Sequence, residues 1–273
     1  MFCRVAKHLN HCVVLQKLAF LRFPIEILRR NACKCSALAH FRLNFYLNLS
    51  DVKSEKINGN VTDMDKEKVN EIIRVLSENF SDKPALVYEN PFQLLIAVIL
   101  SAQCTDERVN KVTAKLFKDY PTPESLASIS QESLEKYIFS CGLYKTKARH
   151  IRSACHDIVE KYDGHVPDDL DSLRSLAGVG RKTANVVYSV AFGGNVIAVD
   201  THVFRVSNRI GLARENNVLA TEKALLKAID GEKLKNAHPH HYLIYLGRSF
   251  CKARKPDCLN CPIEKLCEKN VKR

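Results

Sequence analysis

The stretch LAGVGRKTANVVYSVAFGGNVIAVD, residues 176–200, decides how the rest of the chain is interpreted. It opens with a tight turn from Ala177 to Gly180, where two glycines two positions apart let the backbone turn sharply and adopt positive φ where needed. The segment from Pro167 to Leu176 predicts a short helix, and a second helical run begins at Arg181. The pattern is therefore helix, glycine hairpin, helix.

The start of the second predicted helix combines an anion site with an amine. The N–H groups of Gly180, Arg181 and Lys182 would open this helix, and such an end binds anions such as a DNA phosphate. In this first turn the helix dipole disfavours the protonated form of the lysine. Asp200 precedes Thr201 and another helix, so it is a candidate N-cap as well as a candidate site carboxylate. An amine and a carboxylate could thus meet beside a phosphate-binding turn.

These residues resemble the signature of the endonuclease III family of DNA glycosylases, a helix-hairpin-helix followed by a Gly/Pro-rich loop and an aspartate. The resemblance is carried by LAGVGRKTANVV and, further on, AVDTHVFRV. The family usually has proline where this chain has Ala177, but both glycines of the hairpin remain. The similarity extends from about Met64 to Arg273, so only the first 63 residues fall outside it.

Hydrophobic periodicity predicts an all-α chain from Asp65 onward, because helical stripes follow one another and alternating strand patterns are absent. One stripe consists of Val69, Ile72, Ile73, Leu76 and Phe80. The run after Pro91 is apolar nearly all round, which predicts a central core helix. Thr105 or Asp106 could cap the next helix, and a helix starting at Ser130 is expected to stop at Gly142. The resemblance implies a two-domain helix-hairpin-helix glycosylase fold, with one domain over 84–194, a second combining 64–83 with 195–273, and the active site in the cleft between them.

Four cysteines near the C-terminus form a candidate metal centre: Cys251, Cys258, Cys261 and Cys267. Their thiolates are soft ligands that suit zinc or an iron–sulfur cluster. Structural zinc usually uses two short knuckles, and this segment has a single Cys-x-x-Cys pair. The spacing matches the family's 4Fe–4S loop, so the resemblance implies that cofactor in a structural role. Lys252, Arg254 and Lys255 lie between the first two ligands, where they could contact DNA phosphates or form a solvated basic loop.

The resemblance also assigns roles at the active site. Lys182 matches the lysine nucleophile that attacks C1′ of the sugar and forms a Schiff base, whereas its position alone would suit simple phosphate binding. Asp200 would stabilise the positive charge that develops on the sugar or assist proton transfer. Gln103 would enter the gap left by an extruded base, Leu143 would act as the wedge, and Asp106 would line the base pocket.

Further residues are expected to contact DNA or to serve the fold. The hairpin contributes Gly178, Gly180, Arg181 and Thr183 as expected DNA contacts. His202 is interpreted as structural. The remaining candidate histidines are interpreted as surface or capping residues, because no acid–cysteine constellation surrounds them: His238, His240 and His241.

The net charge and the number of cysteines limit the classes of protein to which this chain can belong. The chain of 273 residues carries a formal charge of +12, of which residues 1–62 contribute +7 through ten Lys/Arg against three Asp/Glu. The remaining +5 permits nucleic-acid binding without establishing it. Eleven cysteines, an odd number, favour reduced thiols plus a metal site over a secreted disulfide framework. No apolar run reaches the length of a membrane span.

The segment 1–63 leaves three interpretations open. It is acid-poor and Arg-rich, which suits a mitochondrial-type transit peptide. A secretory signal fits less well, because Lys17 and Arg22 interrupt the apolar stretch. The segment could instead be an upstream extension of the reading frame, since Met1 and Met64 are the only methionines. In each case we expect it to lack a fixed packing partner, and the fold to need only the residues that follow.

The sequence therefore predicts a bifunctional DNA glycosylase and abasic-site lyase of base excision repair. By resemblance it removes oxidised pyrimidines and cuts the strand 3′ to the abasic site by β-elimination through a lysine Schiff base. Its expected partner is double-stranded DNA containing damaged bases or abasic sites, with no membrane, and the protein is expected to be monomeric. An adenine-DNA glycosylase is disfavoured by the presence of Lys182, and a non-catalytic helix-hairpin-helix DNA-binding protein by the pairing of Lys182 with Asp200. The expected location is the bacterial cytoplasm, with mitochondrion or nucleus as the alternative if segment 1–63 is a targeting peptide.

Overall fold

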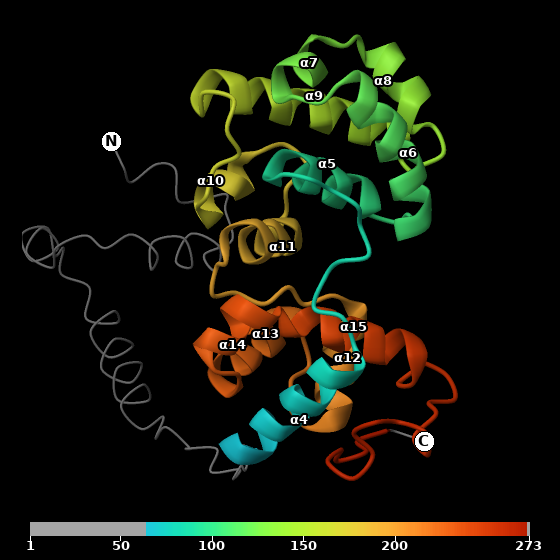
Figure 1. Ribbon diagram of the computed structural model, residues 1–273, viewed down its shortest axis with the longest axis vertical. Helices are drawn as coiled ribbons and strands as arrows, with labels where there is room; N and C mark the ends of the chain where they lie inside the picture. Colours follow the sequence, from blue (N-terminus) through green and yellow to red (C-terminus); the bar gives the residue numbers. More distant parts are fainter. Residues whose placement is uncertain (1–63, 272–273) are drawn as a thin grey trace, which may run out of the picture. The chain divides into compact units, whose positions relative to one another are not determined.

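The computed structural model describes residues 64–271, apart from the side chains of 234–236, and all regular secondary structure in that range is helical. The all-α prediction is therefore confirmed, while the expectations for segment 1–63 lie outside the described residues. The helices, shown in Figure 1, are α4 (Lys66–Asn79), α5 (Pro91–Ser101), α6 (Asp106–Asp119), α7 (Pro123–Ser128), α8 (Gln131–Ile138), α9 (Tyr144–Lys161), α10 (Leu170–Ser175), α11 (Arg181–Phe192), α12 (Thr201–Ile210), α13 (Val218–Ala228), α14 (Gly231–Ala237) and α15 (Pro239–Ser249).

The first hydrophobic core is built around α5. Every residue from Phe92 to Leu100 on this helix is buried, as its uninterrupted apolar run predicts. Helices α6 to α11 contribute the remaining apolar side chains of this core, from Val109 to Val187. A helix that is apolar on all sides gains most from burial when other helices surround it, which explains its central place.

The second core joins the start of the described chain to its C-terminal part. Helix α4 packs its stripe Val69, Ile72, Ile73 and Leu76 against residues of α12, α13 and α15 and against Ile263. Figure 1 shows α4 beside α15, although more than half of the chain lies between them in sequence. These two cores use the residues expected for a two-domain arrangement. That they delimit separate domains stays a prediction.

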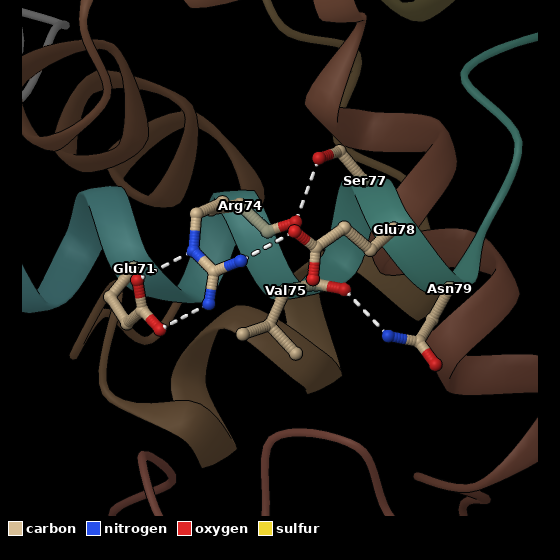
Figure 2. Close-up of polar contacts among 6 residues, drawn as sticks. All are labelled: Glu71, Arg74, Val75, Ser77, Glu78 and Asn79. Atoms are coloured by element: carbon tan, nitrogen blue, oxygen red, sulfur yellow. Dashed lines mark hydrogen bonds and ion pairs between the residues drawn. The ribbon is translucent and has the colours of Figure 1, made fainter.

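The outward face of α4 is polar and internally paired, as Figure 2 shows. Arg74 donates to Glu71 at 2.7 and 2.8 Å and also pairs with Glu78 one turn further on. Asn79 donates to the carbonyl oxygen of Val75 at 2.8 Å near the end of the helix. Pairs at these spacings support a helix by a few tenths of a kcal/mol each, roughly. The helix therefore has one charged face in water and one apolar face in the second core.

Two helix boundaries differ from the predictions. Helix α8 ends at Ile138, before Gly142, and the residue with positive φ in the following turn is Leu143 at +58°. The prediction that Gly142 stops this helix is wrong, because the backbone leaves the helical path earlier. The helix predicted from Pro167 begins instead at Leu170, since the Asp169 side chain accepts hydrogen bonds from the next N–H groups and caps it there.

Candidate active site and DNA-binding surface

Lys182 and Asp200 face the same pocket, although different helices carry them. Lys182 is the second residue of α11 and is exposed. Asp200 is the N-cap of α12, where its Oδ1 accepts a hydrogen bond from the N–H of Val203 at 2.8 Å. Its Oδ2 takes no hydrogen bond from the described residues. The N-cap prediction is confirmed, and the second carboxylate oxygen is left available to a ligand.

The pocket that Lys182 and Asp200 share lies between the two cores and has a volume of about 90 Å³. Sites for drug-sized ligands are larger, roughly 300–1,000 Å³, so the pocket in this structure is small. Its lining combines apolar walls with a few polar groups: Pro84, Ala85, Leu86, Val98, Ser101, Asp106, Lys182, Val186, Ala198, Asp200, His240, His241, Ile244, Tyr245 and Arg248. The side chains of Lys182, Asp106 and Asp200 therefore bring an amine and two carboxylates to one pocket.

The glycine hairpin between α10 and α11 presents backbone N–H groups. Gly178 has φ +79°, and a Cβ built on it would lie 2.9 Å from the Cβ of His150. Gly180 is the N-cap of α11 with φ −83°, and a Cβ there would meet nothing within 4 Å. No side chain caps this helix, so its first N–H groups are open to an anion, and Thr183 lies in the same turn.

The guanidinium of Arg181 is engaged within the protein. It donates to both carboxylate oxygens of Glu222 on α13, at 2.7 and 2.8 Å. Glu222 is buried, and this hydrogen-bonded pair raises the pKa of Arg181 above its ordinary value. Because the guanidinium of Arg181 already binds the Glu222 carboxylate, only the backbone N–H of Arg181 is a proposed phosphate contact.

Asp106 reaches the pocket from the first turn of α6. Thr105 caps that helix, accepting a hydrogen bond from the Arg108 N–H at 3.4 Å, which settles the choice between Thr105 and Asp106. Asp106 pairs with Arg248 of α15 at 2.9 Å. This ion pair joins the two cores across the pocket and fixes the carboxylate at its edge.

Gln103 and Leu143 lie on two adjacent loops rather than in the pocket lining. Gln103 has φ +54° and Leu143 has φ +58°, and both side chains are exposed. A Cβ built on Gly142 would lie 3.2 Å from the carbonyl oxygen of Gln103, so the two loops are in contact. Left-handed backbone in non-glycine residues costs about 1–3 kcal/mol and clusters at functional sites.

The histidines of α15 are the site residues that sequence reasoning misinterpreted. His240 and His241 are buried and line the pocket, so their interpretation as surface or capping residues is wrong. Burial lowers the pKa of His240 well below its ordinary value, and neither of its ring nitrogens has a hydrogen-bond partner within the described residues. His241 Nδ1 lies 2.7 Å from the carbonyl oxygen of Asp82. The sequence signal that could have indicated their burial is the Pro-His-His start of this helix.

His202 and His238 lie outside this pocket lining. Burial lowers the pKa of His202, whose Nδ1 lies 3.2 Å from the Arg205 guanidinium, which agrees with a structural role. His238 stands at the junction of α14 and α15 with φ +39°, and its Nδ1 lies 3.0 Å from the Ser189 hydroxyl.

The C-terminal loop brings all four predicted cysteine ligands to one small pocket, which they line together with Arg209 and Lys269. All four are free thiols. The backbone N–H of Lys269 donates to Cys267 Sγ at 3.2 Å, and Arg209 donates to Cys251 Sγ at 3.7 Å. Within residues 64–271, no three His, Cys, Asp or Glu side chains converge closely enough to hold a single metal ion. The four thiols line one pocket, and N–H hydrogen bonds to ligand sulfurs are typical of iron–sulfur clusters.

The basic loop between the first two cysteines is exposed at Lys252, Arg254 and Lys255. Arg209 holds this loop by donating to the carbonyl oxygens of Lys252 and Ala253, at 2.7 and 3.1 Å. The loop's cationic side chains therefore remain in solvent, where they are available to a polyanion.

Comparisons with known proteins agree with this geometry. A family model described as the HhH-GPD superfamily of base excision DNA repair proteins matches residues 96–230. Endonuclease III of Rickettsia conorii is 49% identical over 206 residues, which are 75% of this chain and 97% of the relative. Endonuclease III of Escherichia coli K12 is 48% identical over 206 residues, with the same 75% and 97% coverage.

Two solved structures share the architecture. A trapped covalent intermediate of endonuclease III with DNA, in an estranged-adenine complex, superposes with a TM-score of 0.69 at 48% identity, covering 75% of this chain and 96% of that one. A thermostable thymine-DNA glycosylase superposes with a TM-score of 0.67 at 25% identity, covering 74% and 96%. Among the described residues, no helix is both long and apolar enough to cross a bilayer.

Proposed function

Because the chain belongs to the endonuclease III family of the HhH-GPD superfamily, we propose that it is a DNA glycosylase and abasic-site lyase that removes oxidised pyrimidines from duplex DNA. The single observation that carries the chemistry is the shared pocket of Lys182 and Asp200 beside an uncapped helix N-terminus. The relative trapped covalently on DNA, at 48% identity, supports the same reaction class.

Lys182 is the proposed nucleophile. Its unprotonated Nζ forms a bond to C1′ of the extruded nucleotide while the N-glycosidic bond breaks, and the bonding electrons leave with the base, which takes up a proton. Opening of the sugar ring and loss of an Nζ proton give an imine between Lys182 and C1′. Removal of a C2′ proton then expels the 3′ phosphate, and water hydrolyses the imine to restore the lysine.

Asp200 is the proposed electrostatic partner of this reaction. Its Oδ1 is fixed by the Val203 N–H, so the carboxylate is held in place before the substrate arrives. Oδ2 faces the positive charge that develops on the sugar as the base departs, which is where preorganised negative charge lowers a barrier most.

The polar edge of the pocket is proposed to read the extruded base. Asp106 is held by Arg248 at the edge of the pocket, and the buried ring of His240 lies in its wall. A pyrimidine ring presents donors and acceptors that such groups can pair with. Gln103 and Leu143, on the neighbouring exposed loops, are proposed to fill the space that the base leaves in the duplex.

Two surfaces are proposed to hold the DNA backbone. The open N–H groups of the hairpin at Gly178, Gly180, Arg181 and Thr183 suit one phosphate group. Lys252, Arg254 and Lys255 supply cationic side chains from the C-terminal loop, independent of sequence.

A 4Fe–4S cluster is the proposed cofactor, held by Cys251, Cys258, Cys261 and Cys267. The four thiols and the N–H donor to Cys267 fit such a group, and the single Cys-x-x-Cys pair differs from the two knuckles usual for structural zinc. When bound, it would supply structural cross-linking of the C-terminal segment. It would thereby fix the basic loop against α12.

We further propose that the protein acts as a monomer and works on the DNA of a bacterial nucleoid, since both relatives compared in sequence come from bacteria. The two-domain division, 84–194 against 64–83 with 195–273, is proposed on the two separate hydrophobic cores.

Borohydride trapping tests the proposed function. Wild-type protein should form a covalent adduct with abasic DNA, because borohydride reduces the lysine imine to a stable amine. Lys182→Ala should lose the adduct yet still bind DNA, whereas Lys115→Ala, which removes an exposed lysine outside the pocket, should trap normally. Undiminished trapping by Lys182→Ala would show that another amine attacks the sugar.

A further inference from the structure

Lys147 is a buried lysine that the proposed chemistry does not use. It is the fourth residue of α9 and is 4% exposed. Its Nζ donates to the carbonyl oxygen of Leu100 at 2.7 Å and to that of Ala102 at 2.6 Å, across more than forty residues of sequence. Burying a lysine is costly unless its charge is compensated, so its retention here calls for an explanation.

The two carbonyls that bind Lys147 form the C-terminal end of α5. That end carries partial negative charge, and the last turn of α5 contains no basic residue of its own. Lys147 therefore supplies, from another helix, the cation that the end of α5 lacks. Ala102 immediately precedes Gln103, so this contact fixes the backbone at the point where the Gln103 loop leaves the helix.

The second loop ends where the helix of Lys147 begins. The backbone N–H of Lys147 donates to the carbonyl oxygen of Leu143 at 3.0 Å, which is the ordinary i to i−4 bond of a helix and remains with any side chain at this position except proline. Arg108 adds a contact between α6 and the turn before Leu143 by donating to the Ser140 carbonyl oxygen at 3.2 Å. The Lys147 side chain therefore holds the start of the Gln103 loop directly, and the Leu143 loop is reached through the close approach of Gly142 to the Gln103 carbonyl oxygen.

From these contacts we propose that Lys147 is a positioning residue for base extrusion, which holds the Gln103 and Leu143 loops in the conformation that enters the DNA stack. This inference rests on the proposed roles of Gln103 and Leu143. Without the ammonium, two helix-end carbonyls lose their donor and the left-handed residues are free to relax. The pocket residues Lys182 and Asp200 have no contact with Lys147, so their chemistry is unaffected once the sugar is accessible.

The test compares a substrate that must be extruded with one that need not be. Lys147→Met removes the charge and the donors but keeps an unbranched apolar chain. Lys147→Gln keeps an uncharged donor, as a second variant if the first is poorly stable. Lys161→Met, at the exposed far end of α9, is the matched control. Each is assayed for release of an oxidised pyrimidine from duplex DNA and for borohydride trapping on a single-stranded abasic oligonucleotide, at a temperature where circular dichroism shows it folded.

We expect Lys147→Met to lose about tenfold or more in duplex base release, since misplacement by about 1 Å can cost up to a hundredfold, while single-stranded trapping stays within about twofold. In a background with Gln103→Ala and Leu143→Ala, the effect of Lys147→Met should largely disappear, because the residues through which it acts are gone. Lys161→Met should match wild type in both assays.

Equal loss in both assays, or full additivity in the double-alanine background, would overturn the inference and leave Lys147 a stability residue. A duplex rate equal to that of Lys161→Met would overturn it as well. If wild-type protein itself traps neither substrate, the failure belongs to the proposed function and not to Lys147.

Discussion

Adding one methyl group at each glycine of the hairpin separates DNA binding from folding. In Gly180→Ala, the new Cβ meets no protein atom within 4 Å, and φ of −83° is comfortable for alanine. The stability cost is limited to the weaker N-cap, about 1 kcal/mol or less. For a domain of this size that lowers the Tm by roughly 2–4 °C.

DNA affinity should respond far more strongly than stability. On the proposed role of this turn, the methyl would stand in the open space beside Gly180, where the phosphate is expected to approach the N–H groups of Gly180 and Lys182. A hydrogen bond to a charged group is worth about 1.5–3 kcal/mol, so losing one should weaken duplex binding by roughly ten- to a hundredfold.

Gly178→Ala provides the opposite case. Alanine at φ +79° costs about 1–2 kcal/mol, and its Cβ would lie 2.9 Å from that of His150, which forces a further shift. The Tm should therefore fall by several degrees, more than in Gly180→Ala. Fluorescence anisotropy on a duplex with an abasic analogue, at fixed salt, and thermal melting measure the two effects. Wild-type affinity in Gly180→Ala, or a Tm as low as that of Gly178→Ala, would refute the phosphate-binding role of this turn.

Three further outcomes are expected. Arg254→Ala should weaken binding to all duplexes alike and reduce the salt slope by about 0.9, whereas an altered lesion preference at unchanged slope would contradict a phosphate contact. Purified protein should absorb at about 400 nm and contain roughly four irons per chain, and removing the iron should lower the Tm. Stoichiometric zinc without iron would exclude the cluster. Burial lowers the pKa of His241 from 6.5 to about 4. At a pH between these two values, His241 is therefore protonated in the unfolded chain and neutral in the folded chain. Stability should therefore fall as the pH decreases through this window, by up to about 1.4 kcal/mol per pH unit, and His241→Gln should flatten that dependence; an unchanged slope in the variant would assign the acid sensitivity elsewhere.

Local patterns in the sequence predict the helices and the position of the reactive pair. The apolar stripe of α4, the all-apolar run of α5 and the N-cap at Asp200 each depend on residues within a few positions of one another. Periodicity and capping act over that range, so they can be recognised without the fold. The proposed role of Lys182 came from the family resemblance, because its position at a helix start would by itself suit simple phosphate binding.

Contacts between distant segments required the tertiary structure. Arg181 has its guanidinium on Glu222, forty-one positions away, and Lys147 donates to carbonyls forty-five and forty-seven positions away. The burial of His240 likewise depends on how α15 packs beside the pocket. The charge state of a side chain, and whether it is free to contact a ligand, depend on the residues around it in space. The spacing of residues along the chain does not show which distant residue will lie beside it. The sequence by itself therefore determined the helices and their caps and named a candidate pair, Lys182 and Asp200, while packing decided which side chains surround that pair.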